Sequence, residues 1–204
     1  MFETREGLLW PTGDRGLFGH RHTIKTLDEE ILPWVSSRKV CVQAGGAAGE
    51  WPHKLAQEFE QVYTFEPNPA LFHCLCHNCP DLNVVKLNAA LGNERELIHV
   101  DNPEKGWNYG SYYVHKGGNI PTFKIDDLAL QACDLIMLDI EGYELQALYG
   151  AEETIKAYKP IIVVEAHADQ YERHGDSLNE LQKWLEAKKY HKVPIRSARD
   201  WLFR

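Results

Sequence analysis

The chain lacks the features that would mark a membrane protein or a disulfide-stabilised secreted protein. None of its 204 residues belongs to an apolar run approaching the roughly 18 residues of a membrane span, and the N-terminal segment has no apolar core of signal-peptide length. It has only five cysteines, an odd number that cannot all pair within the chain. We therefore expect a cytoplasmic protein in a reducing compartment, with no membrane partner.

Basic residues are in the minority. Lys and Arg total 22 against 30 Asp and Glu, for a formal net charge of −8. A surface that grips a nucleic-acid backbone needs clustered Lys and Arg, so we expect no nucleic-acid partner. The length fits one well-buried α/β domain better than two. We predict a single domain over residues 1–204, with residues 1–38 as an N-terminal arm and helix.

Short apolar runs alternate with amphipathic segments along most of the chain. Runs rich in Val, Ile and Leu predict buried parallel strands at 39–44, 62–65, 83–87, 134–140 and 160–167. Helical patterns lie between and after them, at 51–60, 143–158 and 177–189. This alternation indicates a parallel sheet with helices on both faces.

Two local patterns add detail. Ser177 to Glu180 forms a capping-box pattern, and Thr26 with Glu29 repeats it ahead of a helix that precedes the first strand. Residues 97–127 interrupt the strand–helix rhythm, and we predict an inserted hairpin there around Gly117 and Gly118.

The turn "GGAAG", residues 45–49, follows the first predicted strand. In a doubly wound sheet, ligands bind beyond the carboxyl ends of the strands, where small residues let the backbone approach them. Dinucleotide binding would require glycine at the positions of Ala47 and Glu50, and a phosphate loop would require Gly-Lys-Ser/Thr. Phosphate binding is therefore disfavoured, which leaves a nucleoside site or a tight turn without a ligand.

Glu66, at the end of the second predicted strand, favours the nucleoside. A carboxylate at that place can accept hydrogen bonds from both ribose hydroxyls.

Five segments together resemble the FkbM-type family of S-adenosylmethionine-dependent methyltransferases: "VQAGGAAGEW", "YTFEPNPALF", "LNAALGN", "IMLDIEGYELQALYGA" and "PIIVVEAH". The resemblance covers about residues 39–167. It implies a class I methyltransferase fold, which is a Rossmann-like, doubly wound, mostly parallel sheet of seven strands with helices on both faces. It also implies S-adenosylmethionine as cofactor and O-methylation of a hydroxyl, often on a sugar or glycan.

The resemblance also assigns cofactor contacts. The methionine moiety would lie against Gly45, Gly46 and Gly49, the ribose on Glu66, the nucleoside beside Pro67 and Asn68, and the adenine beside Asn88 and Ala89. Three positions depart from the family pattern: Gln43 stands where an acidic residue is usual, Ala47 where Asn is common, and Met137 where Lys is usual. Gln43 supplies no charge to the ammonium group of the cofactor, so these departures bear on affinity rather than cofactor identity.

Two acidic residues at the end of the fourth predicted strand are our candidates for catalysis. Alternation along a strand places Asp139 and Glu141 on one side. We predict Asp139 next to the transferred methyl group, as base or substrate anchor and as a cofactor contact, with Glu141 supporting it. The alternative is that Glu141 caps the following helix. His167, which shares a face with Glu165, is the second candidate base.

The irregular segment supplies the expected acceptor contacts, because its side chains combine flat apolar faces with polar tips. They are Trp107, Asn108, Tyr109, Ser111, Tyr112 and Tyr113. The alternative is that these aromatic residues only pack the hairpin onto the domain. Trp10, His20 and His22 could close over the cofactor.

The segment "HCLCHNC", residues 73–79, contains zinc-type ligands within a single predicted helix. Structural zinc sites usually join ligand pairs from separate elements, so we expect no metal there, and the need for a divalent cation stays open. Two other functions remain as alternatives. One is an NAD-dependent oxidoreductase, and the other is a cofactor-binding protein of the same fold without activity.

Overall fold

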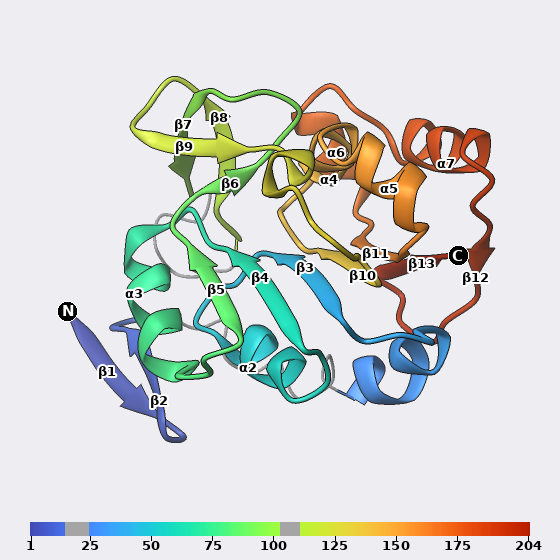
Figure 1. Cartoon of the computed structure of the whole chain (residues 1–204). Helices are drawn as coiled ribbons and strands as arrows, with labels where there is room; N and C mark the ends of the chain where they lie inside the picture. Colours follow the sequence, from blue (N-terminus) through green and yellow to red (C-terminus); the bar gives the residue numbers. More distant parts are fainter. Residues whose placement is uncertain (15–24, 103–110) are drawn as a thin grey trace.

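The structure is a computed structural model in which residues 1–14, 25–102 and 111–204 are described (Figure 1). Its centre is a seven-stranded sheet in the order β12-β13-β11-β10-β3-β4-β5. The strands are β3 (Val40–Ala44), β4 (Gln61–Phe65), β5 (Val84–Leu87), β10 (Leu135–Leu138), β11 (Ile161–Glu165), β12 (Lys192–Val193) and β13 (Asp200–Phe203). All neighbours are parallel except β13, which runs antiparallel to β11 and β12. The predicted doubly wound, mostly parallel sheet is confirmed.

Alternate strand residues face two helical layers, as period-two burial requires. Val42 and Ile136 belong to a core shared with α4 (Glu144–Tyr149), α5 (Glu152–Tyr158) and α7 (Leu178–Ala187). Cys41 and Leu135 belong to a second core with η2 (Leu27–Ile31), η3 (Leu32–Trp34) and α2 (Glu50–Ala56). The chain starts the sheet at β3, winds outward to β5 and returns at β10, so the strand order reverses between β3 and β10.

The insert differs from the predicted hairpin. It forms a second sheet in the order β6-β9-β7-β8, made of β6 (Ala90–Leu91), β7 (Leu97–Asp101), β8 (Tyr113–Lys116) and β9 (Ile120–Phe123). β7 lies between β8 and β9 and pairs antiparallel with both. The turn at Gly117 and Gly118 therefore joins two strands that flank a common partner. A Cβ at Gly118 would lie 2.2 Å from the carbonyl oxygen of Ile98, so glycine lets this turn pass over β7.

The predicted helix over 143–158 is two helices. The break falls at Gly150, where a Cβ would lie 2.0 Å from the carbonyl oxygen of Gly92. Asp126, from η5 (Ile125–Leu128), then accepts hydrogen bonds from the backbone N–H groups of Glu153 and Thr154 and caps α5. A tertiary contact with the insert therefore ends α4 after six residues.

Of the two predicted capping boxes, one forms by half, because the Glu180 carboxylate accepts from the Ser177 hydroxyl instead of closing the box. Ser177 accepts a hydrogen bond from the backbone N–H of Glu180 at the start of α7. Thr26 is itself helical and makes no side-chain cap bond, because a π-helical turn begins there instead. Among the helices of the described residues, none has the length and apolar character that crossing a membrane requires.

The N-terminal hairpin of β1 (Phe2–Arg5) and β2 (Leu8–Pro11) packs on α3 (Pro69–Asn78). Trp10 is buried against Ala48 and Cys74 and is not among the described lining residues of the cleft. Asn78 of α3 links the hairpin to the glycine turn, because its Nδ2 donates to the carbonyl oxygens of Leu9 and Ala48, each at 2.8 Å. His20 and His22 lie outside the described residues.

Candidate active site

A cleft opens at the carboxyl ends of the parallel strands, beside the reversal of strand order. Its volume is about 740 Å³, counting space open to solvent. The lining residues come from the sheet edge, α2, α3 and the insert: Ala44, Gly45, Ala47, Trp51, Phe65, Glu66, Pro67, Leu71, Ala89, Ala90, Leu91, Tyr112, Val114, Asp139, Ile140, Glu141 and Tyr143. Three of them are acidic, and the described lining contains no Lys or Arg. The cleft is large enough for a small molecule and favours a cationic or neutral one.

The glycine turn between β3 and α2 forms one wall. Gly45 has a φ of +84°, and a Cβ there would lie 1.9 Å from the carbonyl oxygen of Asp139, so only glycine allows β3 and β10 to stay paired. Gly45 and Ala47 line the cleft, whereas Gly46 and Gly49 meet α3. Of the turn residues that we predicted to bind the cofactor, two therefore serve the packing of α3 against the sheet.

Glu66 is buried at the end of β4 and fixes two loops. Its Oε2 accepts a hydrogen bond from the backbone N–H of Ala47 and its Oε1 from that of Asn68, each at 2.8 Å. The side-chain oxygen of Asn68 in turn caps α3 by accepting from the backbone N–H groups of Ala70 and Leu71. Each Glu66 oxygen retains capacity for a ligand hydroxyl. Burial raises the pKa of Glu66 to about 7, although both backbone bonds oppose this.

Gln43, predicted to contact the cofactor, lies behind the cleft. Its Nε2 donates to the carbonyl oxygen of Gly45 at 2.9 Å, and its Oε1 accepts from the Thr64 hydroxyl at 2.5 Å. It is 1% exposed and is not among the described lining residues. Gln43 thus stabilises the glycine turn from below.

Asn88 also lies behind the surface of the cleft. Its Nδ2 donates to the carbonyl oxygens of Glu66 at 2.8 Å and Pro67 at 3.1 Å. Pro67 and Ala89 line the cleft, while Asn88 is not among the described lining residues. The amide therefore holds the loop after β4 in place.

The turn after β10 brings Asp139 and Glu141 to the cleft, though for a different reason than strand alternation. Glu141 is in the left-handed region, with a φ of +58°, and so lies outside any regular strand. The turn is held by the buried Glu144, whose Oε1 accepts from the backbone N–H groups of Ile140 at 2.9 Å and Gly142 at 3.3 Å. Turn geometry, rather than the pleat, places both acids on one side.

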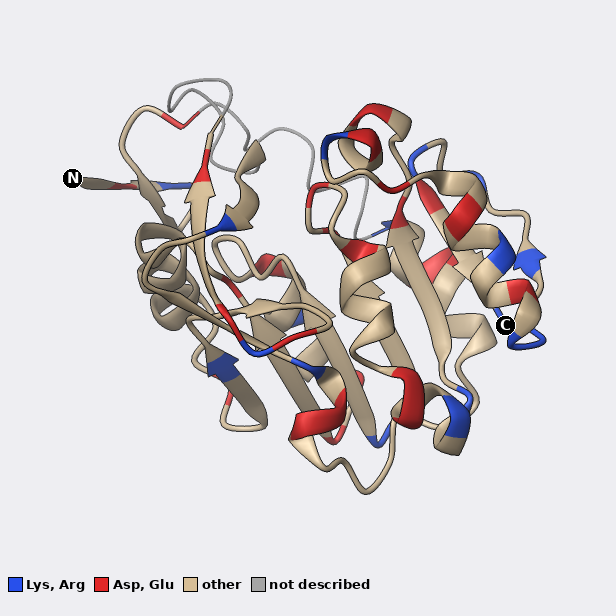
Figure 2. Cartoon of the chain, turned by 90° about the horizontal axis from the view of Figure 1, so that it is seen from above, with Lys and Arg blue, Asp and Glu red and all other residues tan. Residues whose placement is uncertain are grey.

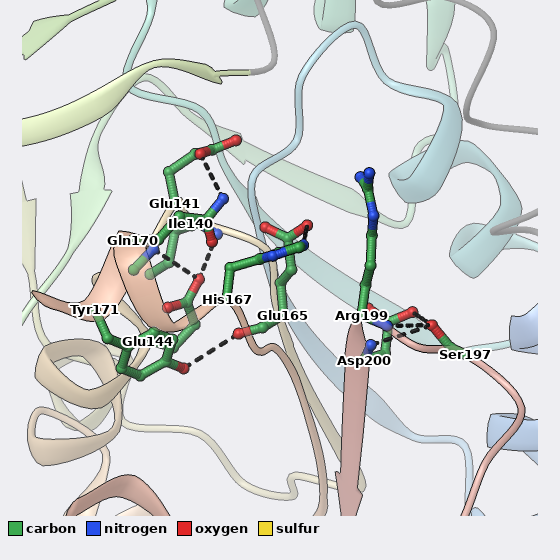
Figure 3. A network of polar contacts seen from close by, with 11 residues as sticks. Ile140, Glu141, Glu144, Glu165, His167, Gln170, Tyr171, Ser197, Arg199 and Asp200 are labelled. Atoms are coloured by element: carbon green, nitrogen blue, oxygen red, sulfur yellow. Dashed lines mark hydrogen bonds and ion pairs between the residues drawn. The ribbon is translucent and has the colours of Figure 1, made fainter. Parts of the chain in front are cut away.

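α6 (Ala168–Arg173) holds the same turn from the other side (Figure 3). Gln170 Nε2 donates to Glu141 Oε2 at 2.8 Å. A Cβ at Gly142 would lie 2.3 Å from the carbonyl oxygen of Gln170, so the two backbones touch. α4 begins at Glu144 without a side-chain cap. The carboxylate of Glu141 is thus engaged by α6 rather than by the helix that follows it.

Three carboxylates lie in a row across neighbouring strands. The parallel register of β10 and β11, continued by one residue, places Glu165 beside Asp139, and β13 places Asp200 opposite Glu165. Burial, with the charge of Glu165, raises the pKa of Asp139 well above its usual range. Burial and the charge of Glu141 raise the pKa of Glu165 to about 7, and burial with Asp139 raises that of Glu141 to about 8.

His167 lies next to this row, at the residue before α6. Its Nε2 is 3.7 Å from Oε1 of Glu165, so the two side chains lie together as predicted. Neither is among the described lining residues of the cleft. Of the three predicted catalytic residues, Asp139 and Glu141 therefore border the cleft.

The methyltransferase FkbM domain matches residues 45–192, which is more than half of the chain. The chain belongs to this family. The resemblance read from the sequence is thereby confirmed. A comparison with the curated proteins finds no match.

Solved structures show the same fold. A methyltransferase FkbM from Methylobacillus flagellatus KT is similar, with a TM-score of 0.58 and 24% identity over 82% of this chain and 44% of that chain. This chain thus spans less than half of the length of that relative. A precorrin-8w decarboxylase from Methanobacterium thermoautotrophicum has a TM-score of 0.52 and 16% identity, over 99% of this chain and 95% of that chain. The N-methyltransferase NodS from Bradyrhizobium japonicum was solved with S-adenosyl-L-homocysteine. It has a TM-score of 0.50 and 14% identity, over 93% of this chain and 87% of that chain.

The predicted acceptor residues of this FkbM-family methyltransferase divide into three groups. Trp107, Asn108 and Tyr109 lie outside the described residues. Tyr112 lines the cleft, whereas Ser111 is not among the described lining residues. Tyr113 is turned toward α6, where the guanidinium carbon of Arg173 lies 4.4 Å from its ring centre.

Several lining residues were missed by sequence reasoning. Tyr143 directly follows Gly142, and only Glu50 separates Trp51 from the glycine turn, so their places beside the two site turns were a usable signal. Ala90, Leu91 and Val114 belong to the insert sheet and carried no such signal, because the insert reaches the cleft only through tertiary packing.

The segment with the His and Cys cluster forms most of α3. Cys74 and Cys79 are buried, Cys76 is exposed, and all five cysteines are free. In the described part of the chain, no group of three or more His, Cys, Asp or Glu side chains is arranged to hold a metal ion.

Proposed function

We propose that this methyltransferase uses S-adenosylmethionine to methylate a hydroxyl of a sugar or a related small molecule. The proposal rests on one arrangement: the glycine turn, Glu66 and Asp139 with Glu141 line a single cleft at the strand reversal. NodS, of the same fold, was solved with the demethylated cofactor, which supports the choice of cofactor.

The residues at the cleft fit this cofactor. Glu66 offers free acceptor capacity to ribose hydroxyls, and the turn at Gly45 and Ala47 leaves room for an amino-acid tail. Trp51 and Phe65 provide apolar surface for an adenine. The acidic lining complements a cationic ligand. When bound, the cofactor supplies an activated methyl group on a sulfonium.

An acceptor hydroxyl loses its proton as its oxygen is methylated, and a positioned base assists this. Asp139 borders the cleft, and its raised pKa makes its carboxylate a stronger base than an ordinary aspartate, which suits it to receive that proton. Glu141 would anchor the acceptor, because Gln170 already fixes its carboxylate. Holding the acceptor in line with the methyl group is the main contribution of the protein.

The composition of the cleft limits the acceptor. The described lining has three acidic side chains and no Lys or Arg, so it offers no cation to hold an anionic acceptor. Tyr112 and Tyr143 combine ring faces with hydroxyl groups, a mixture that suits sugars. Membership of a methyltransferase family disfavours the oxidoreductase alternative.

Calorimetric titration with S-adenosyl-L-homocysteine tests the proposal. We expect the wild type to bind, and Glu66→Ala to weaken binding by about tenfold or more, since it removes a ribose acceptor and frees the Ala47 loop. Glu60→Ala, an exposed glutamate beyond α2, is the matched control and should bind as the wild type does.

A transfer assay with labelled cofactor and a panel of neutral sugars then tests the reaction. We expect methyl incorporation that Asp139→Asn reduces by about 10²-fold or more. Absence of cofactor binding, or equal binding by the Glu66 variant and its control, would refute the proposal.

A further inference from the structure

Asp139 and Glu165 form a pair at the end of the sheet. They occupy neighbouring positions on the parallel strands β10 and β11, which stand about 4.8 Å apart. Because side chains at paired positions of adjacent strands point to the same face of a sheet, the register brings the two carboxyl groups to neighbouring places. Asp139 borders the cleft, whereas Glu165 lies one strand further away. The pair thus joins a residue at the cleft to one behind it.

Glu165 has an unsatisfied oxygen in this position. It is only 8% exposed, and its Oε2 has no hydrogen-bond partner in the described part of the chain. A buried acceptor without a donor is costly. Two ionised carboxylates facing each other supply no donor, whereas one proton between them satisfies both groups.

The groups around the pair are mostly acidic. Those facing Asp139 or Glu165 from the surrounding elements are Glu66 after β4, Glu141 and Glu144 after β10, His167 and Tyr171 at α6, and Arg199 and Asp200 at β13. Arg173 acts on Glu141 from α6. Asp200 is held by Ser197, whose hydroxyl donates to it at 2.6 Å (Figure 3). Four neighbouring carboxylates thus face few cations, which favours a proton on the pair.

We propose that Glu165 is a positioning residue that shares one proton with Asp139 and thereby sets the pH at which Asp139 becomes a free base. This rests on the role of Asp139 in the proposed function. When the shared proton leaves, the two negative charges make Asp139 a stronger base than an isolated aspartate. The acceptor oxygen would form its bond to the methyl carbon as the S–C bond of the sulfonium breaks and leaves a neutral thioether. The proton of the acceptor hydroxyl would then pass to the pair, which restores its singly protonated state.

Carbon NMR of protein labelled at the Asp and Glu carboxyl carbons tests the pair without any ligand. Titration from about pH 4 to about pH 10 should show Asp139 and Glu165 sharing two coupled steps, the upper one at neutral pH or above. Glu165→Gln should leave Asp139 with a single step, at least about one pH unit below that upper step. Asp139→Asn should likewise leave Glu165 with one step.

Asp200→Asn is the matched control, since it also removes a carboxylate beside Glu165. It should shift both steps slightly and preserve the coupling. A wild-type Asp139 that titrates once, in the ordinary aspartate range, would overturn the proposal. So would a loss of coupling in the Asp200 variant equal to that in the Glu165 variant. The titration of Asp139 in the wild type tests the shared proton without any variant, so the proposal can be refuted even if a variant fails to fold.

Cofactor binding separates this proposal from the proposed function. S-adenosylmethionine and S-adenosylhomocysteine share the ribose and the amino-acid tail but differ in the sulfonium charge. The affinity for S-adenosylmethionine divided by that for S-adenosylhomocysteine should therefore rise by about tenfold as the pH increases through the upper titration step of the wild type. The same ratio should change little over this pH range in Glu165→Gln. If this ratio did not depend on pH while the NMR steps were coupled, Asp139 would not lie beside the methyl group, although it would still share a proton with Glu165. Failure of both ligands to bind would refute the proposed function alone.

Discussion

At the scale of single residues, buried and half-buried polar side chains hold the backbone of the site in place. Gln43, Asn88 and Glu144 each bond to backbone groups of a turn that lines the cleft. A ligand pocket built on turns needs such support, because turns have no ladder of hydrogen bonds of their own. These residues explain how small segments keep a fixed shape beside Asp139.

Glu144 offers the clearest test of this support. Glu144→Ala removes the acceptor for two backbone N–H groups inside the protein, so the free energy of unfolding should fall by about 1–3 kcal/mol. Glu144→Gln keeps the accepting oxygen and should cost much less, because the other oxygen of Glu144 lacks a partner in the described structure. Urea unfolding of the two variants measures the difference, and equal losses would contradict this role.

At the scale of elements, glycines decide where strands and helices approach each other. Gly118 lets the turn after β8 cross β7, and Gly150 ends α4 against the insert. Neither contact follows from the local sequence, since the partner backbone lies many residues away. The insert is thereby fixed over the cleft, where Tyr112 and Val114 join its lining.

The neighbouring glycines of that turn make a matched pair. Gly118→Ala would place a Cβ 2.2 Å from the Ile98 carbonyl oxygen, whereas nothing lies within 4 Å of a Cβ at Gly117. Gly118→Ala should therefore cost about 1–3 kcal/mol through overpacking. Gly117→Ala should cost about 1 kcal/mol, for its left-handed φ of +83° alone. If urea unfolding finds Gly117→Ala the more damaging, β7 does not lie between β8 and β9.

At the scale of the whole molecule, charged residues of both signs are mixed along the chain, whereas most buried acidic residues gather at one edge of the sheet. In Figure 2, Lys and Arg residues are scattered among Asp and Glu rather than gathered on one segment. The acidic residues that are buried concentrate at the carboxyl edge of the sheet. The expectation of no nucleic-acid partner stays a prediction, as does the division of the chain into one domain.

The buried carboxyls predict how stability depends on pH. Burial raises the pKa of Glu66, Glu144 and Glu165 to about 7 and that of Glu141 to about 8. Between their unfolded values and these folded values, the native state binds more protons than the unfolded state. The free energy of unfolding should therefore decrease as pH rises from about 5 to about 8. Urea unfolding across this range checks the sign, and a rise would show that these groups are ionised when folded.

The sequence alone determined the sheet, its two helical layers and the family. The reason is that burial on both faces leaves a strong pattern of apolar runs, and the turns at Gly45 and Gly142 need residue types that few other sites require. The same patterns located Glu66, Asp139 and Glu141 correctly at the cleft, although the alternation argument for Glu141 was wrong.

The tertiary structure decided which of these residues reach the cleft and what surrounds them. Glu165 stands beside Asp139 only because β10 and β11 pair in one particular register, and the insert lies over the cleft only because Gly118 and Gly150 allow close backbone contact. Register and contact between distant segments depend on packing summed over the whole molecule. A local pattern of side chains therefore cannot specify them.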